Sequence, residues 1–172
     1  MIKIELLKET NFHLESLDLF GRKQSVNKVY RKIANEYVLV ECKYIEDWDL
    51  NQKRFIAKRI SSSEYISYIA LDNDKVIGFV SLLKSLNGPY MILDMLHVSS
   101  DFREQGIGKK LFEIGIEEAK KVGAKALYIS ACSSEETIVF YKKMGCILTN
   151  NPIKEIVEKE PFDLQMICSV EE

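Results

Sequence analysis

The chain has 172 residues, of which 47% are hydrophobic and 29% charged, a composition typical of a globular protein of about one domain. Its formal net charge of −2 and pI of 5.8 argue against a nucleic-acid-binding protein, whose surface is normally basic. No apolar run approaches the roughly 20 residues of a membrane span, and the first residues, MIKIELLKET, lack the layout of a secretory signal peptide. We therefore expect a cytoplasmic protein.

The N-terminal part of the chain mixes helix and strand patterns. Residues 2–6 alternate between apolar and polar side chains and predict a strand, whereas residues 12–20 are amphipathic and predict a helix. Residues 25–36 are ambiguous, and we interpret them as a second helix. β-Branched and aromatic side chains at residues 37–44 predict a strand, and Asp49 is a suitable N-cap for a helix that follows it.

The rest of the chain predicts a hairpin followed by alternating strands and helices. The turn residues Asp72-Asn73-Asp74 separate two apolar strands, which indicates an antiparallel pair. The later elements lack the regular βαβ repetition of a doubly wound fold, so we expect a mixed α/β (α+β) sheet. The expected elements are strands at 65–71, 75–83 and 91–98, a helix at 107–121, a strand at 125–131, a helix at 134–143, and strands at 146–148 and 162–168.

The cysteines and histidines do not suggest a metal site or a disulfide framework. The cysteines stand at positions 42, 132, 146 and 168, and no two have C-x-x-C spacing. The two histidines, His13 and His97, have no partner at a spacing typical of metal ligands. We expect reduced, mostly buried thiols and no metal ion.

The stretch DFREQGIGKK, residues 101–110, places two glycines between an apolar strand and an amphipathic helix. A helix N-terminus exposes unpaired N–H groups and carries about half a positive charge, so it attracts anions. Glycine lets the backbone approach a ligand closely because it has no Cβ. The stretch fits neither a Walker loop nor the dinucleotide fingerprint G-x-G-x-x-G. From the spacing alone, a phosphate-binding turn and an ordinary glycine-containing turn are equal alternatives.

Two motifs resemble those of the GCN5-related N-acetyltransferase (GNAT) superfamily. Residues 103–108, REQGIG, match the signature R/Q-x-x-G-x-G/A and follow a strand that ends in LHV. Residues 134–146, SEETIVFYKKMGC, resemble the pattern N-x-x-A-x-x-F-Y-x-x-x-G-F, with Ser134 in place of Asn and Thr137 in place of Ala. The resemblance covers residues 64–149, is specific for the superfamily, and is strongest to uncharacterised bacterial members.

The resemblance implies a GNAT fold, in which a central, mostly antiparallel sheet splays between two parallel strands and is flanked by helices. It implies a single domain over residues 1–172. Within it, residues 1–63 would form a variable acceptor-side region, residues 64–149 an acyl-CoA-binding core, and residues 150–172 a closing strand.

The resemblance also implies acetyl-CoA as co-substrate, without a metal. The acetyl-CoA would lie in a V-shaped opening between the strands at 91–98 and 125–131. The hydroxyl of Ser134 would take the place of the usual Asn amide as a hydrogen-bond partner, and Arg103 and Lys109 would add positive charge near the pyrophosphate. The residues expected to bind acetyl-CoA are Leu96, His97, Val98, Arg103, Glu104, Gln105, Gly106, Ile107, Gly108, Lys109, Ser134 and Phe140.

Three side chains are candidates for proton transfer. The resemblance assigns Tyr141 as the general acid that protonates the departing thiolate. Asp94 lies in an otherwise apolar strand, and we expect it either to act as the base or to orient the amine; the alternative is an inert, hydrogen-bonded residue at the strand split. His97 is of a residue type suited to a base, with a partly buried structural imidazole as the alternative.

The expected activity is transfer of an acetyl group from acetyl-CoA to a primary amine by direct attack in a ternary complex. An acidic and aromatic cluster could receive a cationic amine, or could be a solvated loop with a core tryptophan; it consists of Glu41, Glu46, Asp47 and Trp48. The long first region favours a pocket wall and therefore a small-molecule acceptor. A protein N-terminus or lysine as acceptor, and a non-catalytic CoA sensor, are the alternatives. Homodimer formation is left open, and no nucleic-acid or membrane partner is expected.

Overall fold

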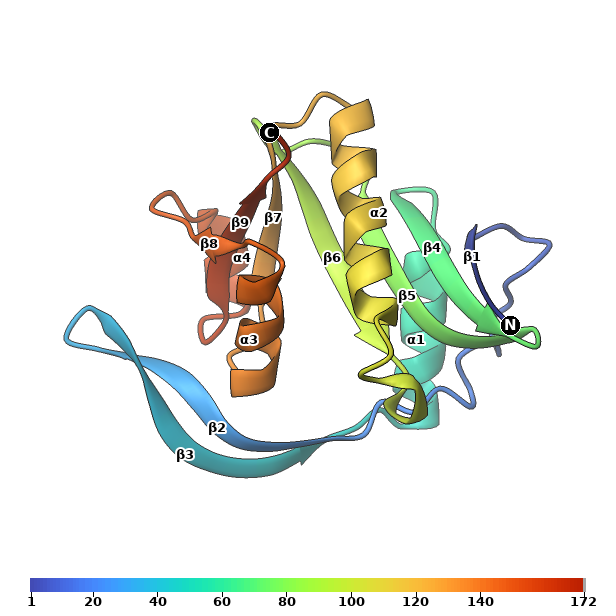
Figure 1. Cartoon of the computed structure of the whole chain (residues 1–172), viewed down its shortest axis with the longest axis horizontal. Helices are drawn as coiled ribbons and strands as arrows, with labels where there is room; N and C mark the ends of the chain where they lie inside the picture. The colour runs from blue at the N-terminus through green and yellow to red at the C-terminus, as the bar shows by residue number, and fades with distance from the viewer. Residues whose placement is uncertain (172) are drawn as a thin grey trace.

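A computed structural model describes residues 1–171 and has a seven-stranded sheet at its centre, in the order β1-β4-β5-β6-β7-β9-β8. Neighbouring strands are antiparallel except β6 and β7, which are parallel. The predicted mixed, mostly antiparallel sheet is therefore confirmed. A separate pair, β2 and β3, forms a long hairpin (Figure 1). The strands are β1 Ile2–Leu6, β2 Gln24–Ile33, β3 Glu36–Glu46, β4 Tyr65–Asp72, β5 Lys75–Leu83, β6 Tyr90–Val98, β7 Ala126–Ala131, β8 Ile147–Leu148 and β9 Leu164–Ser169.

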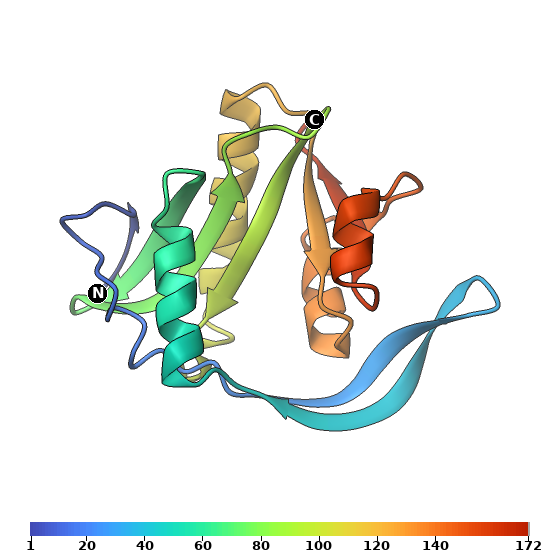
Figure 2. The ribbon, with the colours of Figure 1, turned by 180° about the vertical axis from the view of Figure 1, so that it is seen from behind.

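Helices cover both faces of the sheet. Helices α2 and α3 lie on the face turned to the viewer in Figure 1, which we call the α2 face. Helices α1 and α4 lie on the opposite face, the α1 face, which Figure 2 shows. Among residues 1–171, no helix is both long and apolar enough to cross a membrane. The helices are α1 Leu50–Ile60, α2 Ile107–Lys121, α3 Glu135–Lys143 and α4 Lys154–Lys159, with a 3-10 turn at Ser100–Phe102.

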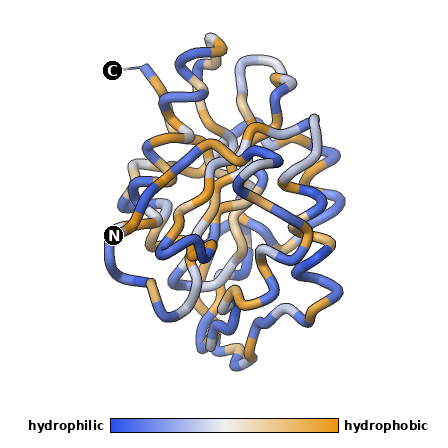
Figure 3. The backbone as a smooth tube through the Cα atoms, turned by 90° about the vertical axis from the view of Figure 1, so that its right-hand side faces the viewer, coloured by the Kyte–Doolittle hydropathy of each residue, from blue (hydrophilic) through white to orange (hydrophobic). Residues whose placement is uncertain are grey.

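Each face of the sheet carries its own apolar cluster. On the α2 face, Leu111 and Phe112 of α2 are buried in the same cluster as Leu127 of β7. On the α1 face, Ile60 of α1 is buried in a second cluster with Phe79 of β5. Hydrophobic segments accordingly gather in the middle of the molecule in Figure 3, and hydrophilic segments follow its outer turns.

Residues 12–20 do not form the predicted helix. They form a series of turns, in which the N–H of Phe20 donates to the carbonyl of Leu17, 3.0 Å away. Phe12, Leu17 and Phe20 are buried in the cluster on the α1 face. Their spacing of five and then three positions would also place them within about 140° of one side of a helix, which explains the wrong prediction. The apolar residues of the segment were thus identified correctly, but not its backbone conformation.

The predicted helix at 25–36 is also wrong, because this segment is strand β2, which pairs with β3. The register of the pair shifts between Val26 and Lys28, which marks a β-bulge. Val26 and Val29 are both buried, although residues three apart on a regular strand point to opposite faces. The bulge places both side chains on the same face of the strand. A spacing of three between residues on one face is also typical of a helix, which explains the wrong prediction. The other predicted elements begin and end within two residues of the observed ones, and α4 was not predicted.

The predicted cap of α1 is confirmed. The Asp49 carboxylate accepts a hydrogen bond from the Gln52 N–H at 2.8 Å, and the Gln52 side chain accepts one from the Asp49 N–H at 2.9 Å. This reciprocal arrangement satisfies two N–H groups that the helix cannot pair internally. It fixes the start of the helix that carries Arg59 towards β6.

Asp49→Ala should lower the free energy of unfolding by about 1 kcal/mol, because the first turn loses its acceptor. Asp49→Asn should cost less, since the Asn side chain can accept the same hydrogen bond. Urea unfolding of both variants measures the difference. Equal losses in the two variants would show that the cap contributes nothing.

Candidate active site

Strands β6 and β7 pair at one end and part at the other. Their parallel register covers residues 90–93 of β6 and 126–129 of β7. At the same point the register of β6 with β5 skips Asp94, which marks a bulge, and a bulge bends the strand that carries it. Residues 94–98 and 130–131 then diverge as two arms (Figure 1). We call this region the β6–β7 fork; it is the splay that was predicted.

The first arm of the fork offers backbone groups for hydrogen bonding. The N–H of Ser99 donates to the carbonyl of Ile77 on the β5 side at 2.7 Å. Because antiparallel strands alternate, the N–H and C=O groups of Leu96 and Val98 point away from β5, towards the diverged β7. The Val98 carbonyl accepts from Arg103 Nε at 3.2 Å. The backbone roles of Leu96 and Val98 stay predictions, but the register gives them the edge that they need.

The N-terminus of α2 has no side-chain cap. Its N-cap is Gly106, with φ of 82°, whereas α1 and α3 are capped by Asp49 and Ser134. Glu104 also has a positive φ, of 63°. A Cβ on Gly106 would meet no atom within 4 Å, so glycine is favoured here by conformation and not by space. The first N–H groups of a fifteen-residue helix are therefore left for an external acceptor.

Gly108 has a different reason to be glycine. A Cβ at this position would lie 3.3 Å from Cε2 of Phe140 and 3.7 Å from Cγ2 of Val98. The residue thus permits α2 to approach α3 and the end of β6. Ile107 is buried in the apolar cluster, so among the predicted turn residues it can offer a ligand only its backbone.

Arg103 is engaged with the protein. Its guanidinium donates to the carbonyls of Val98, Lys23 and Arg22, at 3.2, 3.0 and 3.3 Å. Burial and the neighbouring Arg22 charge lower the pKa of Arg103. The side chain therefore joins the end of β6 to the start of β2. Its predicted role beside a pyrophosphate stays a prediction, and the observed contacts give it a structural role.

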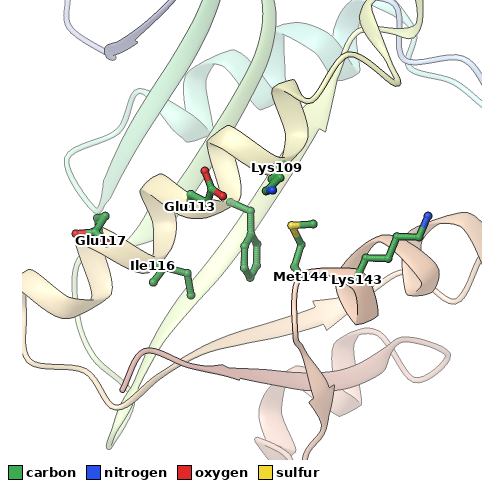
Figure 4. A pocket seen from close by; sticks show the side chains of 7 residues that line it. Lys109, Glu113, Ile116, Glu117, Lys143 and Met144 are labelled. Atoms are coloured by element: carbon green, nitrogen blue, oxygen red, sulfur yellow. The ribbon is translucent and has the colours of Figure 1, made fainter. Parts of the chain in front are cut away.

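A hollow of about 220 Å³ lies between α2 and the end of α3. Figure 4 shows Ile116 of α2 and Met144 at the end of α3 on opposite sides of it, with Lys109 near the start of α2. Phe112 adds an aromatic wall, and Lys143 and Lys109 place positive charge at its rim. Glu113 and Glu117 also line the hollow, which therefore carries charges of both signs around its apolar residues.

Tyr141 points into the protein beside the fork. Its ring lies 5.1 Å from that of Phe140 and 6.2 Å from that of Phe112. Within residues 1–171, no group forms a hydrogen bond with its hydroxyl. Burial raises the pKa of Tyr141, and nearby Cys146, Cys132 and Asp163 add to the effect. The phenol therefore keeps its proton at neutral pH, as a general acid must.

The side chain of Ser134 does not point to a ligand. It is 1% exposed, and its hydroxyl donates to Oγ1 of Thr137 at 2.8 Å while accepting from the Thr137 N–H at 3.4 Å. The predicted hydrogen bond to acetyl-CoA stays a prediction, and the observed contacts show that Ser134 caps α3.

The role of Asp94 as a base stays a prediction, and the structure shows that the side chain is paired. Both of its oxygens accept hydrogen bonds from Arg59 of α1, at 2.9 and 3.0 Å. Because both oxygens are engaged in this two-fold pair, neither is free to face a substrate amine. This pairing agrees with the alternative interpretation, an inert hydrogen-bonded residue at the point where β6 and β7 separate.

His97 faces the α1 side of the sheet and packs among aromatic rings. Its ring centroid lies 4.9 Å from that of Trp48 and 5.6 Å from that of Phe79. Burial, with the positive charges of Arg22 and Arg103 nearby, lowers the pKa of His97 to about 3. A neutral imidazole with so low a pKa is a weak base, which agrees with the structural alternative. Trp48 is likewise a packed residue.

His97 should remain neutral in the folded protein well below pH 6. Its folded pKa lies below the unfolded one, so its contribution to stability is present above about pH 6.5 and is lost as pH falls towards 3. An NMR titration of the imidazole signal, assigned through its loss in His97→Asn, measures this directly. A midpoint near 6.5 would contradict the burial argument.

The hairpin connects the two arms of the fork. On one side, the N–H of Gly21 donates to Oγ of Ser99 at 2.8 Å, next to the Arg103 contacts. On the other side, the N–H of Tyr30 donates to the carbonyl of Ser133 at 2.8 Å. Figure 1 shows β2 and β3 passing below both arms. This connection was not predicted, because residues 25–36 were interpreted as a helix.

The segment before β9 supplies a second group that the sequence analysis missed. Asp163 accepts a hydrogen bond from Ser130 on the second arm of the fork at 2.9 Å. Glu46 of β3 pairs with Arg22 at 2.8 Å. The acidic residue directly before the apolar strand β9 can be recognised in the sequence, but no local pattern predicts that it lies at the fork.

A family model described as the acetyltransferase (GNAT) family matches residues 28–146, more than half of the chain. The chain belongs to this family. A curated GNAT relative, N-alpha-acetyltransferase 30 of Schizosaccharomyces pombe, is 29% identical over 83 residues, or 46% of this chain and 55% of that protein. The chain thus spans about half the length of this relative.

Solved structures show the same fold over almost the whole chain. A protein assigned as a streptothricin acetyltransferase from Bacillus anthracis, in complex with acetyl coenzyme A, has a TM-score of 0.71 and 20% identity, and covers 97% of this chain and 96% of that one. A nourseothricin acetyltransferase has a TM-score of 0.76 and 15% identity, with 99% of both chains covered. At these identities the likeness establishes the GNAT fold alone.

Proposed function

We propose that the protein transfers an acetyl group from acetyl-CoA to a primary amine of a small molecule. The observation that carries this proposal is the position of the uncapped α2 N-terminus at the open end of the β6–β7 fork, in a chain that belongs to the acetyltransferase family. The same fold holds acetyl coenzyme A in a structural neighbour. Membership of the family argues against a nucleic-acid-binding module.

The residues of the fork fit this substrate. The free N–H groups at the start of α2, with no acidic side chain in its first turn and Lys109 beside them, would hold the pyrophosphate. The backbone edge at Leu96 and Val98 would align the pantetheine arm and offer an N–H to the acetyl carbonyl. Such a donor stabilises the negative charge that develops on the oxygen, and losing one typically costs about 10²–10³ in rate. The Tyr141 hydroxyl would protonate the departing thiolate.

The hairpin supports a small acceptor. The segment from Gly21 to Tyr30, which leads into β2, is bonded to both arms of the fork, and at this position it would obstruct an extended peptide. The partial likeness to an N-alpha-acetyltransferase favours a protein N-terminus as the second candidate. Release of free CoA thiol with streptothricin, compared with a peptide that has a free α-amino group, separates the two.

Acetyl-CoA and CoA should each raise the melting temperature, whereas ATP at the same concentration should not. A ligand that binds only the folded state stabilises it by mass action, by about 2.7 kcal/mol at 100 times its Kd. Differential scanning fluorimetry measures the shift. No shift with either CoA species would remove the cofactor site and the proposed function with it.

Tyr141→Phe should lower kcat by about 10²-fold or more, because the thiolate would leave without a proton donor. Its thermal shift with acetyl-CoA should stay close to that of the wild type. Tyr90→Phe, at the paired end of β6, removes the same atom away from the fork and should retain activity. Equal turnover by Tyr141→Phe would exclude the phenol from the mechanism.

A further inference from the structure

A chain of hydrogen bonds on the α1 face of β7 and β9 ends at Asp163. The N–H of Ile153 donates to the Tyr128 hydroxyl at 3.0 Å, and that hydroxyl donates to Oε1 of Gln165. The Gln165 amide donates to the Ser130 hydroxyl at 2.9 Å, which donates to Oδ2 of Asp163 at 2.9 Å. Each donor in the chain points towards the carboxylate.

This arrangement holds Asp163 in place and leaves one of its oxygens free. Tyr128 and Gln165 are buried, so the chain is rigid behind the carboxylate. Among the described residues, Oδ1 of Asp163 has no hydrogen-bond partner and no cation forms a salt bridge with the group. The half-buried carboxylate lies against Ser130, the first residue of β7 beyond its pairing with β6. Asp163 is therefore an unpaired anion at the fork.

The charges around Asp163 are mostly negative. Glu160 lies on its own segment and Glu46 on β3, and both act on the carboxylate. Cys132 and Tyr141, whose pKa values are raised, are the uncharged titratable groups in its surroundings. Burial, with Glu160 and Glu46 nearby, raises the pKa of Asp163 to about 6, against the opposing effect of the Ser130 hydrogen bond. The nearest guanidiniums are engaged elsewhere, since Arg22 pairs with Glu46 and Arg31 stacks on Phe162. A cation at Oδ1 would relieve this unbalanced charge.

Given the proposed function, on which this inference rests, we propose that Oδ1 of Asp163 binds the ammonium group of a cationic amine acceptor and removes its proton. The other candidates are less suitable. Asp94 is already paired with Arg59 through both oxygens, and His97 is packed between aromatic rings. Asp163 combines a free oxygen, a fixed position and a place beside Ser130 on the second arm of the fork.

The proton balance is complete. The ammonium gives one proton to Oδ1 of Asp163, and the neutral amine attacks the acetyl carbonyl carbon. The C–N bond forms and the C–S bond breaks, with the electron pair leaving on sulfur. The sulfur takes the Tyr141 proton, and Tyr141 regains one from the acylated nitrogen. The ammonium and acetyl-CoA thus give the N-acetyl amide, CoA thiol and one proton, which Asp163 releases to solvent.

The test compares the wild type with Asp163→Asn and with the control Glu160→Gln, which removes an exposed charge from the same segment. Streptothricin, spermidine and a peptide with a free α-amino group serve as probes, with free thiol as the readout. Asp163→Asn retains an acceptor for Ser130 but cannot take the proton. We expect it to lower kcat/KM by about 100-fold or more, and Glu160→Gln to remain close to the wild type.

The pH profile distinguishes a catalytic role from a structural one. The wild-type kcat/KM should fall on the acid side with a midpoint near 6, as Asp163 becomes protonated, and this limb should be absent in Asp163→Asn. Ser130→Ala should move the limb to higher pH, because the lost hydrogen bond stabilises the carboxylate. Both shifts would be absent if Asp163 only supported the fold.

Stability should change in the opposite direction from activity. The folded pKa of Asp163 lies above its unfolded value, so the stability linked to its protonation is present below about pH 4 and is lost as pH rises through 6. At pH 8 Asp163→Asn should therefore melt higher than the wild type, which excludes misfolding as the cause of lost activity.

The outcomes separate the two proposals. Absence of any thermal shift with acetyl-CoA overturns the proposed function. A wild type that binds acetyl-CoA but acetylates none of the three amines overturns the acceptor assignment at Asp163. An active wild type whose acid limb and kcat/KM are matched by Asp163→Asn overturns the role of Asp163 alone.

Discussion

Strands β6 and β7 exchange backbone hydrogen bonds only over residues 90–93 and 126–129, although both strands continue. A parallel pair that stops inside a sheet leaves polar backbone groups without partners, which is costly unless another group satisfies them. The bulge at Asp94 turns β6 away and determines where pairing ends. The backbone edge, the start of α2 and Tyr141 all depend on this separation, because none of them would be accessible if the two strands stayed paired.

The polar residues around the fork divide into those that maintain its shape and those that remain free. Arg103, Ser134 and Asp94 belong to the first group, since each has its hydrogen-bonding groups engaged with the protein. The N–H groups of the first turn of α2 and Oδ1 of Asp163 belong to the second. One is positive and the other negative, and they approach the fork from its two arms. Such a division suits a reaction that brings together an anionic cofactor and a cationic acceptor.

The sequence predicted the core of the fold well because its signals are local. The apolar run of β6, the glycine turn and the periodicity of α2 each lie within one continuous stretch, and their boundaries were correct within two residues. The hairpin was missed because the bulge in β2 places Val26 and Val29 on one face, which imitates a helical spacing.

The site residues were harder to predict, because their roles depend on contacts that are distant in sequence. Asp94 is neutralised by Arg59, 35 positions away, and Asp163 is held by Ser130, 33 positions away. No local pattern distinguishes a carboxylate that will meet a guanidinium from one that will stay free. The motif residues taken from the family were informative about the backbone, but the role of Ser134 as the cap of α3 depends on its contact with Thr137, which the motif did not predict.

The segment from Arg22 to Tyr30 is attached to both arms of the fork, so its length limits the distance between them. Between Arg22, whose carbonyl Arg103 holds, and Tyr30, which is bonded to Ser133, the chain has eight residue steps. At about 3.3 Å per residue, such a segment can separate its two attachments by at most about 26 Å. The strand therefore acts as a spacer of fixed length, and the far ends of β6 and β7 can move apart only as far as it allows. The maximum width of the fork is thus set by the length of a segment that is not part of the seven-stranded sheet.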